Sequence, residues 1–253
     1  MPDATAIVTC MTDAERPFLR ETLKSVYTQT VPCEIIVVVL DSNSWIDAVV
    51  GEFPGTQIIR RPLGWLGAVR NTGIEAASSE FVAFLDGDDV WLPTKIQRQI
   101  DFLRTSHQDF VAVDHMLITE AGKVFAFALA RHLPMPSSWM VRRQTMLQHP
   151  FNPELPTMED ADWWFSTWHS VRKWRLPEPL IRYRVRGQSL SAASASKRRK
   201  LAFARMSGMP VARPLLLAAT YVMHRLSRRT DYVPAKDWTV PPAPELRDDV
   251  QIS

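Results

Sequence analysis

Apolar and polar residues alternate along the first hundred positions in a way that predicts strands and helices in turn. Short β-branched and apolar runs predict strands at residues 5–10, 34–40, 56–60 and 80–85. Apolar residues recur at helical spacing in 16–29, 66–77 and 92–104. The run EIIVVVL is apolar throughout, which is typical of a parallel strand covered on both faces. This order predicts an α/β fold with a mostly parallel sheet flanked by helices.

The pattern is less regular after residue 105. Apolar runs at 110–118 and 123–130, separated by Ala121-Gly122, predict a hairpin. Further helices are expected over 137–149 and 158–171, and a late strand over 180–187.

Length and composition favour one main domain. At 253 residues, with 46% hydrophobic and 23% charged residues, the chain resembles an ordinary soluble globular protein. We expect a domain over 1–190, with halves at about 1–105 and 106–190, then a basic helical extension over 191–230. A Pro-rich tail over 231–253 is expected to be extended or disordered.

The ends and the cysteines suggest a cytoplasmic protein. The N-terminus lacks the features of a signal peptide, and no apolar run reaches the roughly 20 residues that span a bilayer. The two cysteines, Cys10 and Cys33, form no metal-ligand spacing.

Positive charge is concentrated in one segment. Residues 197–229 contain nine Lys or Arg and no acid, which leaves the rest of the chain at −6 against a net charge of +3. These charges flank the apolar stretch PLLLAATYVM. One expectation is peripheral contact with the inner face of the cell membrane. The alternative is a helical pair packed on the main domain. A nucleic-acid partner is not expected, because no aromatic interleaving or recognised binding module accompanies the charges.

The run FVAFLDGDD ends a buried-looking strand in three carboxylates around one glycine, at Asp86, Asp88 and Asp89. A turn followed by a helix cap is the simpler explanation. However, Asp41 also follows a strand directly, and ligands of parallel sheets bind beyond the carboxyl ends of the strands. Two strand ends that present carboxylates to one crevice favour a functional site.

The ordered set of segments resembles the inverting nucleotide-sugar glycosyltransferases of family two, which have the GT-A fold. The resemblance covers about residues 5–191 and is densest over 64–98. It is carried by TAIVTCMTD, LKSVYTQTVPCEIIVVVLDSNS, LGAVRNTGIEAASSEFVAFLDGDDVWLPTKIQRQ, MEDADWW and PEPLIRYRVRGQSLS. Such an ordered set is more specific than any single motif.

The resemblance implies a set of donor contacts. Thr9 and Asp41 match nucleotide-contacting positions, and Asp41 is expected to read the base. Arg70 and Asn71 match a pair that lies along the nucleotide and its phosphates. Asp86 is expected to be shared between the ribose and a metal.

The resemblance also implies a metal and a base. Asp86 and Asp88 match the D-x-D pair, Asp88 being the more direct ligand of Mn²⁺ or Mg²⁺. Such an ion, held by one or two carboxylates, neutralises a diphosphate leaving group whose oxygens complete its shell. Asp160 matches the general base, which takes the proton of the attacking hydroxyl. The simpler interpretation of Asp160 is that it only caps or charges the start of its helix. Glu159 and Asp162 are expected to have only this role.

Two positions depart from the family pattern. Leu40 replaces an acid that is common before Asp41, and Arg186 stands where Y-R-x-H would give a histidine. Arginine can bind phosphate but cannot ligate a metal, which leaves the role of Arg186 open.

The resemblance implies a metal-dependent inverting transferase that moves a sugar from a UDP-, GDP- or dTDP-sugar to a hydroxyl of a glycan or lipid-linked acceptor. The alternatives are a non-catalytic module that binds nucleotide-sugar or glycan, and a nucleotidyltransferase of similar fold. Several tryptophans could stack on a sugar or belong to the core, namely Trp65, Trp91, Trp139 and Trp163.

Overall fold

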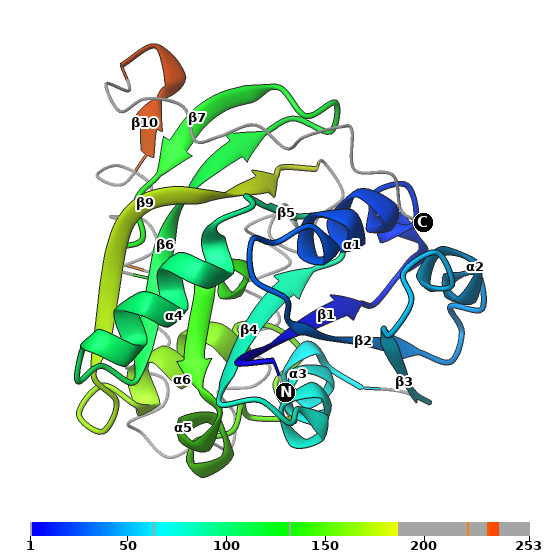
Figure 1. Ribbon diagram of the computed structural model, residues 1–253, viewed down its shortest axis with the longest axis horizontal. Coiled ribbons are helices and arrows are strands. Elements are labelled where there is room, and N and C mark those ends of the chain that lie inside the picture. The colour runs from blue at the N-terminus through cyan, green and yellow to red at the C-terminus, as the bar shows by residue number, and fades with distance from the viewer. Residues whose placement is uncertain (1, 63, 132, 187–221, 223–231, 238–253) are drawn as a thin grey trace.

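A single curved sheet forms the centre of the protein in the computed structural model, with helices on both faces (Figure 1). The structure describes residues 2–62, 64–131, 133–186, 222 and 232–237. Within them the sheet has ten strands, with β10-β7-β6-β8-β4-β1-β2-β3 as its main order. The strands are β1 Ala4–Cys10, β2 Glu34–Leu40, β3 Gln57–Arg61, β4 Phe81–Asp86, β5 Val90–Trp91, β6 Phe110–Ile118, β7 Val124–Ala128, β8 Trp139–Arg142, β9 Lys173–Arg184 and β10 Tyr232–Pro234.

Six α-helices accompany this sheet in the described residues: α1 Leu19–Tyr27, α2 Ile46–Val50, α3 Leu66–Ala76, α4 Lys95–Thr105, α5 Arg143–Gln148 and α6 Glu159–Ser166. Apolar residues of α1 and α4 join one buried cluster, and those of α3 and α6 join the cluster on the other side. Successive side chains of β1 point to opposite faces of the sheet, so Val8 belongs to the first cluster and Ile7 to the second.

The first half of the sheet is parallel, as the sequence predicts. β3, β2, β1 and β4 pair in parallel in that order. Their carboxyl ends therefore meet at one edge, which is where ligands of such sheets bind. The register of β1 and β4 places Thr9 directly opposite Asp86.

The second half makes the whole sheet mixed. β6 and β7 form the expected hairpin, with Gly122 in the left-handed region at φ 81°. β8 is antiparallel to both β4 and β6 and connects the two halves. β9 runs parallel to β6 and ends beside β5 (Figure 1).

The predicted helix over 137–149 is wrong in its first part. Residues 139–142 form β8, and the helix α5 begins only at Arg143. Trp139, Met140 and Val141 are fully buried between neighbouring strands. A segment with only three apolar residues has no period that separates strand from helix, so the pairing partners decide its conformation.

Part of the predicted Pro-rich tail is an ordered strand. β10 pairs antiparallel with β7, and a short 3-10 helix follows at Ala235–Asp237. Residues 231 and 238–253 of the tail lie outside the described residues. The helices expected within 197–229 also lie outside them, apart from residue 222.

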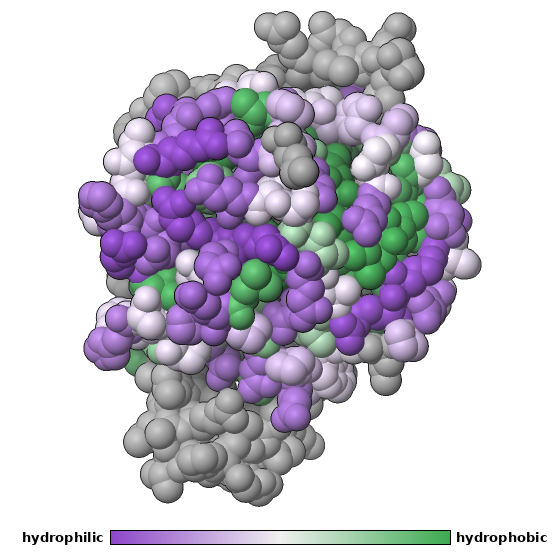
Figure 2. Space-filling model, turned by 60° about the horizontal axis from the view of Figure 1, so that its bottom comes forward, coloured by the Kyte–Doolittle hydropathy of each residue, from purple (hydrophilic) through white to green (hydrophobic). Residues whose placement is uncertain are grey.

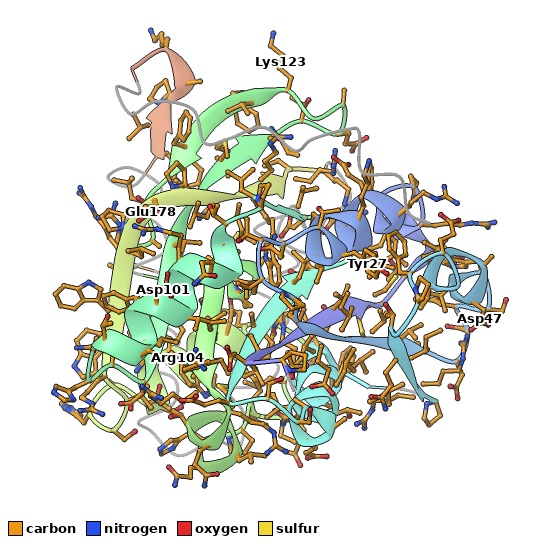
Figure 3. The ribbon with its side chains drawn as sticks, viewed as in Figure 1. Tyr27, Asp47, Asp101, Arg104, Lys123 and Glu178 are labelled. Carbon is orange, nitrogen blue, oxygen red and sulfur yellow. The ribbon has the colours of Figure 1, made fainter. Side chains whose placement is uncertain are left out.

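The polarity of one face of the molecule can be followed in Figure 2. Figure 2 shows the lower face of the molecule as mostly polar, with an apolar area toward one side. Asp101 and Arg104 of α4 are exposed, and Figure 3 shows them on the outer side of that helix. No helix in the described part of the chain has the length and hydrophobicity that a bilayer crossing requires.

Candidate active site

Three of the predicted site residues follow or end parallel strands at the carboxyl edge. The Thr9 hydroxyl of β1 donates to Asp86 Oδ1 of β4 at 3.1 Å. Asp41 follows β2 with an exposed side chain, and its backbone N–H donates to the carbonyl of Arg61 at 2.8 Å. Thr9 and Asp86 are therefore brought together by strand pairing.

Asp88 lies in the turn after β4 and is only 7% exposed. Nε of Arg186 lies 2.6 Å from Asp88 Oδ2, so the guanidinium is its ion-pair partner. Burial raises the pKa of Asp88 to about 6; the charge of Asp86 adds to this rise, while Arg186 opposes it. The positive charge of Arg186 thus does not fully offset burial and the negative charge of Asp86.

Asp89 has a structural role distinct from that of the other two carboxylates. It is fully buried and accepts hydrogen bonds from the Ser137 hydroxyl at 2.7 Å and the Arg184 N–H at 2.9 Å. The Ser137 hydroxyl also accepts from the Asp86 N–H at 3.1 Å. Asp89 therefore holds the turn to β9 and to the segment before β8.

Arg184 supports this turn from β9, a role that the sequence did not reveal. Its side chain is 2% exposed and reaches three segments. Nε donates to the carbonyl of Asp88 at 2.9 Å, one Nη to that of Glu120 at 2.6 Å and the other to the Glu21 carboxylate at 2.6 Å. Only the repeated arginine in Tyr183-Arg184-Val185-Arg186 hinted at it.

Arg70 joins the two acidic parts of the site. It is 1% exposed, and its Nη2 donates to Asp86 Oδ1 at 2.9 Å while its Nη1 pairs with Glu159 at the start of α6. The guanidinium carbon lies 5.7 Å from the centre of the Phe151 ring. Both terminal nitrogens are thus engaged by carboxylates, so their geometry here does not match the phosphate contact that the resemblance implies.

The Asn71 amide is likewise engaged within the protein. Its Nδ2 donates to the carbonyl of Phe151 at 2.8 Å, and its Oδ1 accepts from the Phe151 N–H at 3.0 Å. The residue fastens α3 to the loop that leads to α6. This loop passes close to the helix, because a Cβ on Gly67 would lie 2.7 Å from the Asn152 carbonyl.

The start of α6 presents two acids in different surroundings. Met158, the residue before the helix, is left-handed at φ 68°. Glu159 is 4% exposed and paired with Arg70. It therefore does more than stabilise the start of the helix, which was the only role expected for it. Burial raises its pKa to about 7, against the opposing charge of Arg70. Asp160 is partly exposed, and its Oδ1 accepts from the Ala161 N–H at 2.8 Å.

The environment of Asp160 suits a proton acceptor. Burial raises its pKa, and the charge of Asp86 adds to this rise, whereas Arg70 opposes it. A carboxylate with a raised pKa accepts protons more readily at neutral pH than an ordinary aspartate.

Asp86 and Asp88 together fit a hard divalent cation only in part. No group of three or more His, Cys, Asp or Glu within the described ranges has the arrangement of a complete metal site. Two carboxylates separated by one residue do match the way proteins hold Mg²⁺ or Mn²⁺ through one or two carboxylates, with phosphate oxygens and water completing the shell.

Most of the tryptophans considered for stacking lie in the core. Trp91, Trp139 and Trp163 are buried, whereas Trp65, just before α3, is 50% exposed. A pocket of about 440 Å³ is lined by residues outside the predicted site. It is lined by Val26, Tyr27, Pro32, Ile35 and Pro54 among others.

The sequence is similar to those of known glycosyltransferases. The model of the family described as "Glycosyl transferase family 2" matches residues 5–169. An uncharacterized glycosyltransferase of Methanocaldococcus jannaschii is 24% identical over 192 residues, which are 66% of each chain. The succinoglycan biosynthesis protein ExoW of Rhizobium meliloti is 36% identical over 108 residues, 40% of this chain and 32% of that protein.

The fold is also found among solved structures. The crystal structure of S. aureus TarS 1–349 in complex with UDP-GlcNAc has a TM-score of 0.67 and 18% identity. The match covers 90% of this chain and 74% of that chain. The mixed sheet and its helices are thus a GT-A fold, which confirms the predicted fold class.

The family match extends over more than half of the sequence and includes every predicted site residue. The chain belongs to glycosyl transferase family 2. It spans 66% of the first of these relatives and 32% of the second.

Proposed function

We propose that this protein transfers a sugar from a nucleotide-diphosphate sugar to a hydroxyl group of a glycan or lipid-linked acceptor. The observation that carries the proposal is the bridge from Asp86 through Arg70 to Glu159, which brings the D-x-D turn and the start of α6 into one site. The residues proposed to bind the donor and the residue proposed as general base then lie in the same site.

The names of similar proteins support the choice of substrates. TarS was crystallised in complex with UDP-GlcNAc. A relative of Escherichia coli, 34% identical over 58 residues, is named UDP-Glc:alpha-D-GlcNAc-diphosphoundecaprenol beta-1,3-glucosyltransferase WfgD. A UDP-sugar donor and a lipid-linked glycan acceptor are therefore the first pair to try.

Thr9, Asp41 and Asp86 are the proposed donor contacts. Asp41 is proposed to contact the nucleobase of the donor, because its exposed carboxylate follows β2 directly. Arg70 and Asn71 contribute by positioning, since the first orients Asp86 and the second anchors the loop before α6. Direct contact of these two with the nucleotide would need their present partners to be released.

Asp88 and Asp86 would hold Mn²⁺ or Mg²⁺ together with the diphosphate. Such a dication supplies charge neutralisation of the leaving group. The protein's own residues prepare that place: Asp89 and Arg184 fix the turn, and Thr9 and Arg70 orient the Asp86 carboxylate.

Asp160 is the proposed general base. It accepts the proton of the acceptor hydroxyl as that oxygen attacks the anomeric carbon. One base without an enzyme nucleophile implies a single direct displacement and inversion at that carbon. Glu159 is less suited to this role, because it is buried against Arg70.

Donor hydrolysis screened across UDP-, GDP- and dTDP-sugars with Mn²⁺ tests the proposal. We expect turnover of one donor and its loss in Asp88→Asn. That variant should still fold, since the ionised form of Asp88 is already disfavoured by burial. Asp101→Asn, on the exposed side of α4, is the matched control (Figure 3). A folded protein that neither binds nor hydrolyses any of these donors contradicts the function.

We further propose peripheral contact with an anionic membrane surface through residues 197–229. Nine basic side chains without an acid support this, since each such charge near an anionic leaflet contributes about 1 kcal/mol. A lipid-linked acceptor would be presented at the same surface.

A further inference from the structure

Arg186 lies next to Asp88, and its contacts within the described residues use only part of its hydrogen-bonding capacity. Its side chain is 10% exposed. Nη1 donates to the carbonyl of Ala14 at 2.8 Å, and Nη2 lies 3.7 Å from Glu15 Oε1, beyond hydrogen-bonding distance. Nε is close to Asp88 Oδ2 but lacks the alignment of a hydrogen bond. Within the described residues, one of its three nitrogens therefore has a well-formed hydrogen bond.

This state is unusual for a nearly buried guanidinium. Arginine carries five N–H donors in a rigid fork, and buried donors without partners cost free energy. The fork matches carboxylate and phosphate oxygens in pairs. Arg184, two residues earlier, has all three nitrogens bonded, which shows what a purely structural arginine looks like at this place. Arg186 therefore keeps N–H groups that an incoming anion can use.

The partner of Arg186 is also the carboxylate that the proposed dication would need. A cation at Asp88 and a second cation on the same carboxylate repel each other. A diphosphate that arrives with the dication offers oxygens to both of them, so the repulsion is relieved only when the donor is present.

We propose that Arg186 is a donor-binding residue that neutralises Asp88 in the empty site and contacts the diphosphate in the loaded one. This inference rests on the function proposed above. It has two consequences. The protein binds a dication alone only weakly, and it retains measurable affinity for a nucleoside diphosphate without any dication.

A purely structural role for Arg186 makes a different prediction. The Ala14 carbonyl and the Phe18 ring, 5.8 Å from the guanidinium carbon, could simply pin the end of β9 to the segment after β1. Loss of that pin would lower the melting temperature but would leave the affinities for Mn²⁺ and for nucleotide unchanged in the folded protein.

Calorimetry on the full chain separates the two roles. Mn²⁺ alone, UDP with EDTA, and UDP with Mn²⁺ are titrated into wild type, Arg186→Gln and Arg186→Lys. We expect Arg186→Gln to bind Mn²⁺ alone roughly tenfold more tightly and UDP with EDTA roughly tenfold more weakly, the scale of one charge-assisted hydrogen bond. Arg186→Lys should lie between. Arg98→Gln is the control, because the half-exposed Arg98 of α4 pairs with Glu178 of β9 rather than with a predicted site residue.

The outcomes distinguish this inference from the proposed function. If UDP binds with Mn²⁺ but both other titrations are unchanged in Arg186→Gln, the inference is wrong and the function stands. If wild type binds neither UDP, GDP nor dTDP with Mn²⁺, both fail. Should Arg186→Gln not fold, Asp88→Asn provides the converse test: Mn²⁺ binding should vanish while UDP binding with EDTA persists or tightens. Loss of that EDTA-resistant binding overturns the inference.

Discussion

Arg70 and Asp160 come from distant segments, yet the charge of Arg70 acts on the pKa of Asp160. Burial raises this pKa, the guanidinium of Arg70 opposes the rise, and the charge of Asp86 adds to it. Glu159, the neighbour of Asp160, takes up one nitrogen of Arg70 directly. The Asp160 side chain remains partly exposed, whereas Glu159 is buried against Arg70.

Asp160→Asn should bind donor normally and lose roughly 10²- to 10⁴-fold in transfer rate, the usual scale for a general base. In the wild type, the transfer rate should fall as the pH drops through the raised pKa of Asp160, above the usual range for aspartate. Initial rates and donor titrations measure both effects. Asp162→Asn, on the same helix, serves as control. Transfer that persists within a few fold in Asp160→Asn would mean that Asp160 only caps α6.

His115 predicts a pH dependence of stability. It is buried in β6, its Nδ1 has no partner within the described residues, and burial lowers its pKa from 6.5 to about 4. Between these values the unfolded chain binds a proton that the folded chain does not. Stability should therefore fall as the pH drops from about 6.5 toward 4, and at 1.36 kcal/mol per unit the loss amounts to about 3 kcal/mol.

Urea unfolding at pH 7 and pH 4 measures this loss. His115→Phe keeps a ring beside Tyr183, 6.0 Å away, and should have a flatter pH profile than the wild type. The exposed His107 provides the control variant His107→Gln, which should keep the wild-type profile. An unchanged profile in His115→Phe would assign the pH dependence to other groups.

At the scale of elements, the packing of α3 against the sheet positions several of the predicted site residues. This helix carries Arg70 and Asn71, and it packs on β1, which carries Thr9. The contact is close because Gly73 faces Ile7: a Cβ on Gly73 would lie 2.4 Å from the Ile7 Cγ2 atom. A small residue at this position lets the helix approach the strand that carries Thr9.

Gly73→Ala should lower stability even though alanine is the better helix former. The overlap with Ile7 costs about 1–3 kcal/mol, against about 1 kcal/mol gained in helix propensity. Thermal and urea unfolding measure the change. The double variant Ile7→Ala/Gly73→Ala removes the opposing methyl group and should be more stable than the sum of the single effects predicts. Strict additivity would show that the two residues are not in conflict.

At the scale of the whole molecule, one sheet carries both parts of the site. The parallel half places Thr9, Asp41 and Asp86 at one edge, and β8 continues the sheet into the antiparallel half. β9 then returns to this edge and delivers Arg184 and Arg186 to the D-x-D turn. The D-x-D turn is therefore held by residues that lie almost one hundred positions away along the chain.

The basic segment predicts behaviour of the whole molecule at a membrane surface. The protein should sediment with anionic liposomes at low salt and be released at high salt, because the attraction is screened over about 10 Å at 0.1 M salt. Neutral liposomes should not bind it. A variant in which Lys197, Arg198, Arg199 and Lys200 become Gln should bind more weakly while its melting temperature is unchanged. Absence of binding at low salt would contradict the proposal.

The sequence alone determined the strands of the parallel half, the family resemblance and the candidate residues Asp86, Asp88 and Asp160. Local apolar periodicity and short motifs carry that information within a few residues. The tertiary structure decided what these residues contact: β8 is a strand because β4 and β6 pair with it, Asp89 is a structural anchor because Ser137 and Arg184 bond it, and Arg186 faces Asp88. Such partners lie far away along the chain, and burial and charge act through space, so no local pattern records them.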